Sequence, residues 1–205
     1  MDRKQSPQAP IHDVERFRPT SGRFTGAVLV VAGLAFGALS LIEPSQVIPE
    51  VGAGGFFAAV LGWTAMLRPR VSVVHDDLEL RNMLETVSIP LAAVEEMAVR
   101  QVLAVRAGEK RFTSPALGRG RKSLVKGQTV DEAPSDGPSH VPSTYPEFVE
   151  DRIRKRITGA RAHAGVRPGS DEQVALASGV RRAPAWPEIV ALVVSAVGLV
   201  TAVVL

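Results

Sequence analysis

The chain has 205 residues, contains no cysteine and carries a formal net charge of +3. The lack of cysteine excludes disulfides, thiol catalysis and cysteine-based zinc sites. All 24 Lys and Arg residues lie outside three long apolar runs, a distribution that indicates a multi-pass membrane protein.

The three apolar runs are residues 24–42, 51–67 and 186–205. At about 1.5 Å per residue, helices of this length match the hydrocarbon thickness of a bilayer. The sequence therefore predicts a transmembrane helical hairpin over 24–67 and a third transmembrane helix over 186–205. The hydrophilic leader of 23 residues is longer than the charged region of a signal peptide, so the first run is interpreted as a span.

Basic residues flank the runs on one side only. The connection 43–50 has no Lys or Arg, whereas Arg68, Arg70, Arg181 and Arg182 adjoin span ends. Excess Lys and Arg marks the cytoplasmic side of a membrane. We therefore expect a plasma (inner) membrane protein with the N-terminal segment 1–23 and the middle of the chain in the cytoplasm, and with its C-terminus outside.

Small residues recur in the runs at the spacing of packed helices, as in Gly33 and Gly37 of the first run. Such residues let helices approach closely in lipid. Two readings stay open: packing among the protein's own helices, and oligomerisation or docking to a larger membrane complex. The other residues of this kind are Ala58 and Gly62 in the second run and Ala191, Ser195, Gly198 and Ala202 in the third.

Beyond Arg70 the pattern changes to short alternating runs joined by turn residues. Leu78 and Leu80, for example, alternate with charged neighbours. Strands of this kind predict small antiparallel sheets or a partly open barrel over residues 68–117. We expect five of its apolar side chains to share one interior: Val73, Leu80, Ile89, Val99 and Val105.

A Gly- and Pro-rich stretch over 118–143 predicts a flexible linker. It contains the first set of candidate contacts for a lipid headgroup or an acidic partner, although a merely solvated linker is the alternative. That set comprises Arg119, Arg121, Lys122 and Lys126.

An amphipathic helix is predicted over 144–163, with Thr144 and Glu147 forming a capping box. Its apolar stripe should cap the β structure. Its other face carries the second set of candidate contacts, which are Arg152, Arg154, Lys155 and Arg156. Residues 164–185 are predicted to be a second linker.

Three segments carry a family resemblance: PRVSVVHDDLELRN (69–82), SIPLAAV (88–94) and RFTSPALG (111–118). They resemble the bacterial pleckstrin-homology-like (PH-like) domain of small membrane-anchored proteins of the low-molecular-weight protein antigen type. The stretch RRAPAWPE (181–188) is similar to the entrance of that family's last span. The resemblance covers residues 69–118 well and 145–205 loosely.

The resemblance implies two antiparallel sheets capped by a C-terminal helix, and it supplies no catalytic residue. The expected fold is thus three transmembrane helices plus a cytoplasmic, mainly-β PH-like domain. Phosphoinositide-binding PH domains carry Lys and Arg in the first loop, where this chain has Asp76 and Asp77. Two acids would repel a phosphorylated headgroup, so we expect no specific phosphoinositide binding.

No enzyme is expected. The four histidines are dispersed without metal-ligand spacing, and we expect no catalytic, cofactor or metal residue and no nucleic-acid partner. The predicted function is a membrane-tethered binding or scaffold module that recognises a protein or, in second place, anionic lipid. A membrane-protein partner and a homo-oligomer both stay open. The alternative is a structural accessory or assembly subunit of a larger membrane complex.

Overall fold

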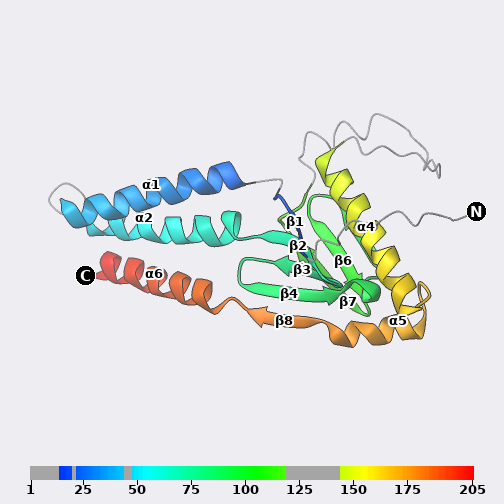
Figure 1. Cartoon of the computed structure of the whole chain (residues 1–205). Helices are drawn as coiled ribbons and strands as arrows, with labels where there is room; N and C mark the ends of the chain where they lie inside the picture. The colour runs from blue at the N-terminus through cyan, green and yellow to red at the C-terminus, as the bar shows by residue number, and fades with distance from the viewer. Residues whose placement is uncertain (1–13, 20–21, 44–47, 119–143) are drawn as a thin grey trace, which may run out of the picture.

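The computed structural model describes residues 14–19, 22–43, 48–118 and 144–205. Three long helices lie side by side, and a β-rich unit stands at one end of them (Figure 1). The three helices and the β-rich unit are described in turn below.

The helices are α1 (Arg23–Ile42), α2 (Pro49–Gly62) and α6 (Trp186–Val204), and α2 continues into one π-helical turn, η1 (Trp63–Leu67). By length and composition all three are able to cross a membrane. The helices predicted from the apolar runs are therefore confirmed. In the described part of the chain α2 packs against both α1 and α6.

Glycine allows the close approach of α1 to α2. A Cβ atom on Gly33 would lie 2.3 Å from the carbonyl oxygen of Gly55, and one on Gly55 would lie 2.8 Å from the carbonyl oxygen of Gly33. Neither position can hold a larger residue without moving the helices. For α1, packing among the protein's own helices is thus confirmed. On α2 the buried small residues include Ala59 and Gly62, whereas Ala58 is only partly covered.

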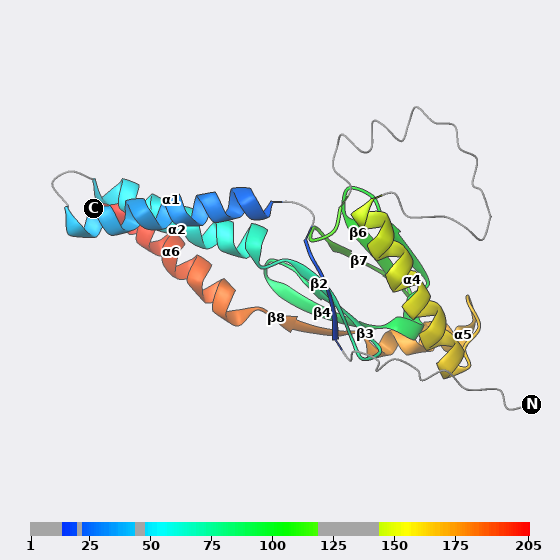
Figure 2. The ribbon, with the colours of Figure 1, turned by 45° about the horizontal axis from the view of Figure 1, so that its top comes forward.

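Two antiparallel sheets form the β-rich unit (Figure 2). The larger has the order β1-β2-β3-β4-β8, and the smaller has the order β5-β6-β7. The strands of the larger sheet are β1 (Val14–Phe17), β2 (Arg70–Val74), β3 (Asp77–Arg81), β4 (Glu85–Pro90) and β8 (Arg181–Pro184). Those of the smaller sheet are β5 (Glu96–Val99), β6 (Leu103–Ala107) and β7 (Lys110–Ser114).

The core residues predicted from the alternation of apolar and polar residues are confirmed. In β3, Leu78 and Leu80 are fully buried, whereas Arg81 is exposed. The expected interior residues Val73, Leu80, Ile89, Val99 and Val105 all belong to one buried cluster, each at most 2% exposed. Strands β2 to β7 all fall within the predicted range 68–117.

Helix α4 (Tyr145–Ala164) covers the β-rich unit, within one residue of its predicted bounds. The side chain of Glu147 accepts a hydrogen bond from the backbone N–H of Thr144 at 3.2 Å, as in a capping box. The apolar stripe of Val149, Ile153 and Ile157 is buried in the core cluster. In both views α4 lies on the side of the unit away from the three long helices (Figures 1 and 2).

The prediction of a linker over 164–185 is wrong. This segment forms α5 (Asp171–Leu176), a 3-10 turn, η3 (Ala177–Gly179), and β8, which pairs with β4. Gln173 is fully buried, and its Nε2 donates to the carbonyl oxygens of Ala92 at 3.2 Å and Val94 at 2.9 Å. These bonds satisfy a buried amide and fasten α5 to the sheet edge.

The predicted boundaries of the β domain are also too narrow at the N-terminal side. β1 lies within the segment 1–23 yet pairs with β2 and buries Phe17. It is held from a second side by α4, because the backbone N–H of Arg18 donates to the Tyr145 hydroxyl at 2.7 Å.

Short junctions join the larger sheet to all three long helices. Residues 18–22 connect β1 to α1, Arg68 and Pro69 connect η1 to β2, and Ala185 alone connects β8 to α6. Since β1 and β8 are the two edges of this sheet, both edges continue into long helices. The β-rich unit is thus joined to the long helices at three points along the chain.

Candidate binding surfaces

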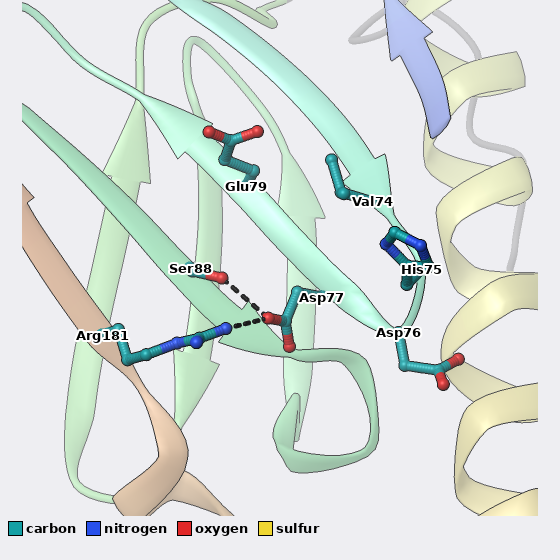
Figure 3. A pocket seen from close by; sticks show the side chains of 7 residues that line it. All are labelled: Val74, His75, Asp76, Asp77, Glu79, Ser88 and Arg181. Atoms are coloured by element: carbon teal, nitrogen blue, oxygen red, sulfur yellow. Dashed lines mark hydrogen bonds and ion pairs between the residues drawn. The ribbon is translucent and has the colours of Figure 1, made fainter. Parts of the chain in front are cut away.

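The turn between β2 and β3 borders a cleft of about 450 Å³ (Figure 3). Because β2 begins at η1 and runs away from the long helices, this turn lies at the far end of the unit (Figure 1). The lining residues are Val74, His75, Asp76, Asp77, Glu79, Ser88 and Arg181.

The carboxylate of Asp77 has two partners within this cleft. Its carboxylate accepts a hydrogen bond from the Ser88 hydroxyl at 2.9 Å and pairs with the Arg181 guanidinium at 2.6 Å (Figure 3). The side chain of Arg181 is 76% exposed, so this pair contributes little to stability. It does set the position of the Asp77 carboxylate at the cleft wall.

Asp76 and His75 form the exposed tip of the hairpin. His75 has a φ of 55°, the left-handed conformation that a tight turn requires. The backbone carbonyl of Asp76 accepts from the N–H of Leu91 at 2.7 Å, which fixes the turn against the chain after β4. Within the described residues the Asp76 carboxylate has no ion pair, and Figure 3 shows it pointing away from Asp77.

The charge of the cleft is acidic. Asp77 pairs with Arg181 and Glu79 pairs with Arg81 at 3.2 Å, so the Asp76 carboxylate is the charge that these two pairs leave in excess. Such a site favours a cationic ligand and disfavours phosphate. Among the described residues there is no group of three or more His, Cys, Asp or Glu side chains that could hold a metal ion.

The predicted basic face of α4 is present, but its charges are compensated. Two of the four basic side chains form ion pairs with Glu15 of β1, and the other two form ion pairs with acidic side chains of α4 itself. The ion pairs are Arg152–Glu15 at 2.8 Å, Arg156–Glu15 at 3.8 Å, Arg154–Glu150 at 2.7 Å and Lys155–Asp151 at 2.8 Å. Pairing of this kind weakens attraction to an anionic surface.

Two arginines of α4 also bind the sheet. Arg154 donates to the carbonyl oxygen of Met97 at 3.3 Å, and Arg161 donates to the carbonyl oxygens of Val94 and Glu95. Burial lowers the pKa of Arg161, while the negative charge of Glu95 acts in the opposite direction. These contacts assign a structural role to this side of α4.

The other predicted contacts, Arg119, Arg121, Lys122 and Lys126, lie outside the described residues. The structure brings Asp77 together with Arg181, a contact that the sequence analysis missed. Arg181 is 104 residues from Asp77, and nothing local in the sequence indicates the pairing of β8. A broader hollow of about 1,140 Å³ lies over β5, β6 and β7 and was also missed.

Comparison with protein-family models, with curated proteins and with solved structures finds no match for this chain.

Proposed function

We propose that this protein is a membrane-tethered, PH-like binding module that presents the β2–β3 cleft to a protein partner in the cytoplasm. One observation carries the proposal: three short junctions fix the β-rich unit to the apolar helices, and the cleft lies at the opposite end. A domain held in this way keeps its binding surface at a constant height above a membrane. Tethering raises its effective concentration toward other membrane-associated proteins without new contacts.

The orientation rests on charge. The helix ends nearest the β-rich unit adjoin Arg23, Arg68 and Arg70, whereas Glu43 adjoins the far end of α1. Basic residues beside spans favour the cytoplasmic side. The proposed location is therefore the plasma membrane, with the β-rich unit inside the cell and the C-terminus outside.

The PH-like assignment is supported by element order. Antiparallel strands of one sheet precede a three-stranded sheet, and a C-terminal helix places an apolar stripe into the shared core. Two features add to the pattern that the family resemblance implies: the edge strands β1 and β8, and the short helix α5.

A protein ligand fits the charges better than lipid does. The basic residues of α4 are paired, and α4 lies on the side away from the long helices. The cleft exposes the carboxylate of Asp76, which has no ion pair with any residue that the structure describes. A cationic segment of another protein would complement this cleft.

The test is affinity purification of the full chain in mild detergent, with and without the substitution Asp76→Arg. Asp76 is exposed at a turn, so the change should leave the fold intact while reversing the charge. We expect the amount of a co-purifying partner to fall at least about tenfold, as expected when a charge pair at an interface becomes repulsive. Glu109→Arg, at the exposed turn between β6 and β7, is the matched control and should retain the partner. Equal recovery with both variants would exclude the cleft as the binding site.

A second candidate is an accessory subunit of a larger membrane complex. It is favoured by α6, which has no buried residue and leaves Ala191 and Gly198 exposed. In that case Gly198→Leu should remove the co-purifying complex, and Asp76→Arg should keep it.

A further inference from the structure

A crevice of about 340 Å³ lies between the three long helices at their end nearest the β-rich unit. Its walls come from α1, from α2 with η1, and from α6. The lining residues are Val30, Leu34, Ala59, Val60, Trp63, Thr64, Pro187, Glu188 and Ala191.

The crevice is lined mainly by apolar side chains. The hydroxyl of Thr64 and the carboxylate of Glu188 already have partners within the protein. The Thr64 hydroxyl donates to the carbonyl oxygen of Val60 at 2.9 Å, and the Glu188 carboxylate accepts from Arg68 Nε at 2.6 Å. An occupant therefore needs no polar group inside the crevice.

The crevice lies beside about one turn of α1 and of α6. Pro187 and Glu188 stand in the first turn of α6, whereas Leu34 lies well inside α1. At about 1.5 Å per residue, the lining residues Val30 and Leu34 are roughly 6 Å apart along the axis of α1, and Val30 is roughly 11 Å from Arg23. A crevice of this length contacts a short stretch of an extended chain lying parallel to the helices.

A cationic group stands on the same face of α1 as the crevice. Arg23, Val30 and Leu34 share that face, because they occupy positions i, i+7 and i+11. Arg23 is exposed and has no ion pair among the described residues. Arg81, by contrast, pairs with Glu79 at 3.2 Å.

We propose that the crevice binds one acyl chain of an anionic phospholipid and that Arg23 attracts its headgroup. The proposal rests on the three helices spanning a membrane, as in the proposed function. An apolar wall on the same helix face as an exposed arginine complements a lipid, which joins a hydrocarbon chain to a phosphate. Each arginine near a bilayer surface contributes appreciably to attraction for anionic lipid.

Trp63 allows a direct test, because its indole lines the crevice and is 53% exposed. The full chain carrying Trp186→Phe has Trp63 as its one tryptophan, since the sequence contains two. The purified protein in mild detergent is titrated with phosphatidylglycerol or phosphatidylcholine brominated on the acyl chains. We expect half-maximal quenching of Trp63 at an about tenfold lower mole fraction of phosphatidylglycerol than of phosphatidylcholine, a preference that weakens with salt.

Two substitutions separate the chain site from the headgroup site. Ala191→Phe fills the crevice and should raise the half-quenching mole fraction of both lipids at least about tenfold. Arg23→Gln should reduce the preference for phosphatidylglycerol about fivefold and leave phosphatidylcholine unchanged. Gly198→Phe, on the same face of α6 but outside the crevice, and Arg111→Gln, on β7, are the matched controls and should behave as the parent protein does.

Quenching of the Ala191→Phe variant at the mole fraction of the parent protein would overturn the proposal, as would equal quenching by the two lipids. Loss of a co-purifying protein, rather than of lipid, on Ala191→Phe would assign the crevice to a partner helix and also overturn it. Flotation of the reconstituted protein with liposomes checks the membrane placement separately. If the protein floats with liposomes but shows no preference for phosphatidylglycerol, the lipid site is wrong and the membrane placement stands. The quenching experiment uses purified protein, so its result does not depend on the proposed protein partner.

Discussion

Arg68 is the residue that joins the three parts of this molecule. It follows η1 directly, pairs with Glu188 of α6 at 2.6 Å, and donates to the carbonyl oxygen of Asn82 in the turn between β3 and β4. Asn82 in turn donates to the carbonyl oxygen of Thr113 at 3.0 Å, in the smaller sheet. With its side chain only 13% exposed, Arg68 fixes α6 and both sheets against the end of α2.

Gln173 is the corresponding anchor at the opposite end of the β-rich unit. Replacing it with alanine removes its hydrogen bonds to the carbonyl oxygens of Ala92 and Val94, the second of which is buried, and leaves a void where a fully buried side chain stood. We expect Gln173→Ala to lower the free energy of unfolding by about 2 kcal/mol. Glu172→Ala, at an exposed neighbouring position, should change it by less than about 0.5 kcal/mol. Thermal unfolding of the full chain in detergent measures both, and equal melting temperatures would contradict a structural role for α5.

At the scale of elements, local patterns account for what could be predicted. Alternation located β2 to β7, and the stripe of Val149, Ile153 and Ile157 located α4. β1 and β8 are four residues each, and their sequences, VERF and RRAP, contain few apolar residues. Their pairing partners are distant in the chain, so periodicity gives no signal for them. α5 was missed because its buried side chain, Gln173, is polar.

The candidate site, too, could be predicted from the sequence only in part. Asp76 and Asp77 were predicted to lie in the first loop, as a reason against phosphoinositide binding, and not to line a binding cleft. The cleft itself depends on β8, which brings Arg181 to Asp77. The basic face of α4 was located correctly as a face, but its charge depends on Glu15, which only the pairing of β1 places there.

The packing of α1 on α2 gives a prediction at this scale. A methyl group on Gly33 would meet the carbonyl oxygen of Gly55 at 2.3 Å, so Gly33→Ala must separate the two helices. We expect the melting temperature of the full chain in detergent to fall, with a loss of about 1–3 kcal/mol, as for other overpacked sites. Gly198→Ala is the matched control, because a Cβ atom there meets nothing within 4 Å. Equal stability of the two variants would mean that α1 and α2 do not pack at Gly33.

At the scale of the whole molecule, the three junctions determine which surfaces face where. If the helices span the membrane, the turn between β3 and β4 lies near the leaflet, because Leu84 accepts from the N–H of Ala185 at 2.8 Å at the start of α6. The turn between β2 and β3 and the outer side of α4 then lie at the end away from the membrane (Figure 1). The two proposed sites therefore lie at different ends of the molecule. The crevice between the helices is assigned to a lipid, and the cleft beside the β2–β3 turn is assigned to a protein.

The orientation gives the last prediction, and the lack of cysteine in the chain makes it simple to test. Glu43 follows the last residue of α1, at the end away from the β-rich unit, and Glu109 stands at the exposed turn between β6 and β7. Because basic residues beside spans stay in the cytoplasm, a cysteine at Glu43 should react with a membrane-impermeant maleimide in intact cells. A cysteine at Glu109 should react only after the cells are lysed. The reverse labelling would place the β-rich unit outside the cell and remove the basis for a cytoplasmic protein partner. Labelling of both sites in intact cells would mean that the apolar helices do not separate them by a membrane.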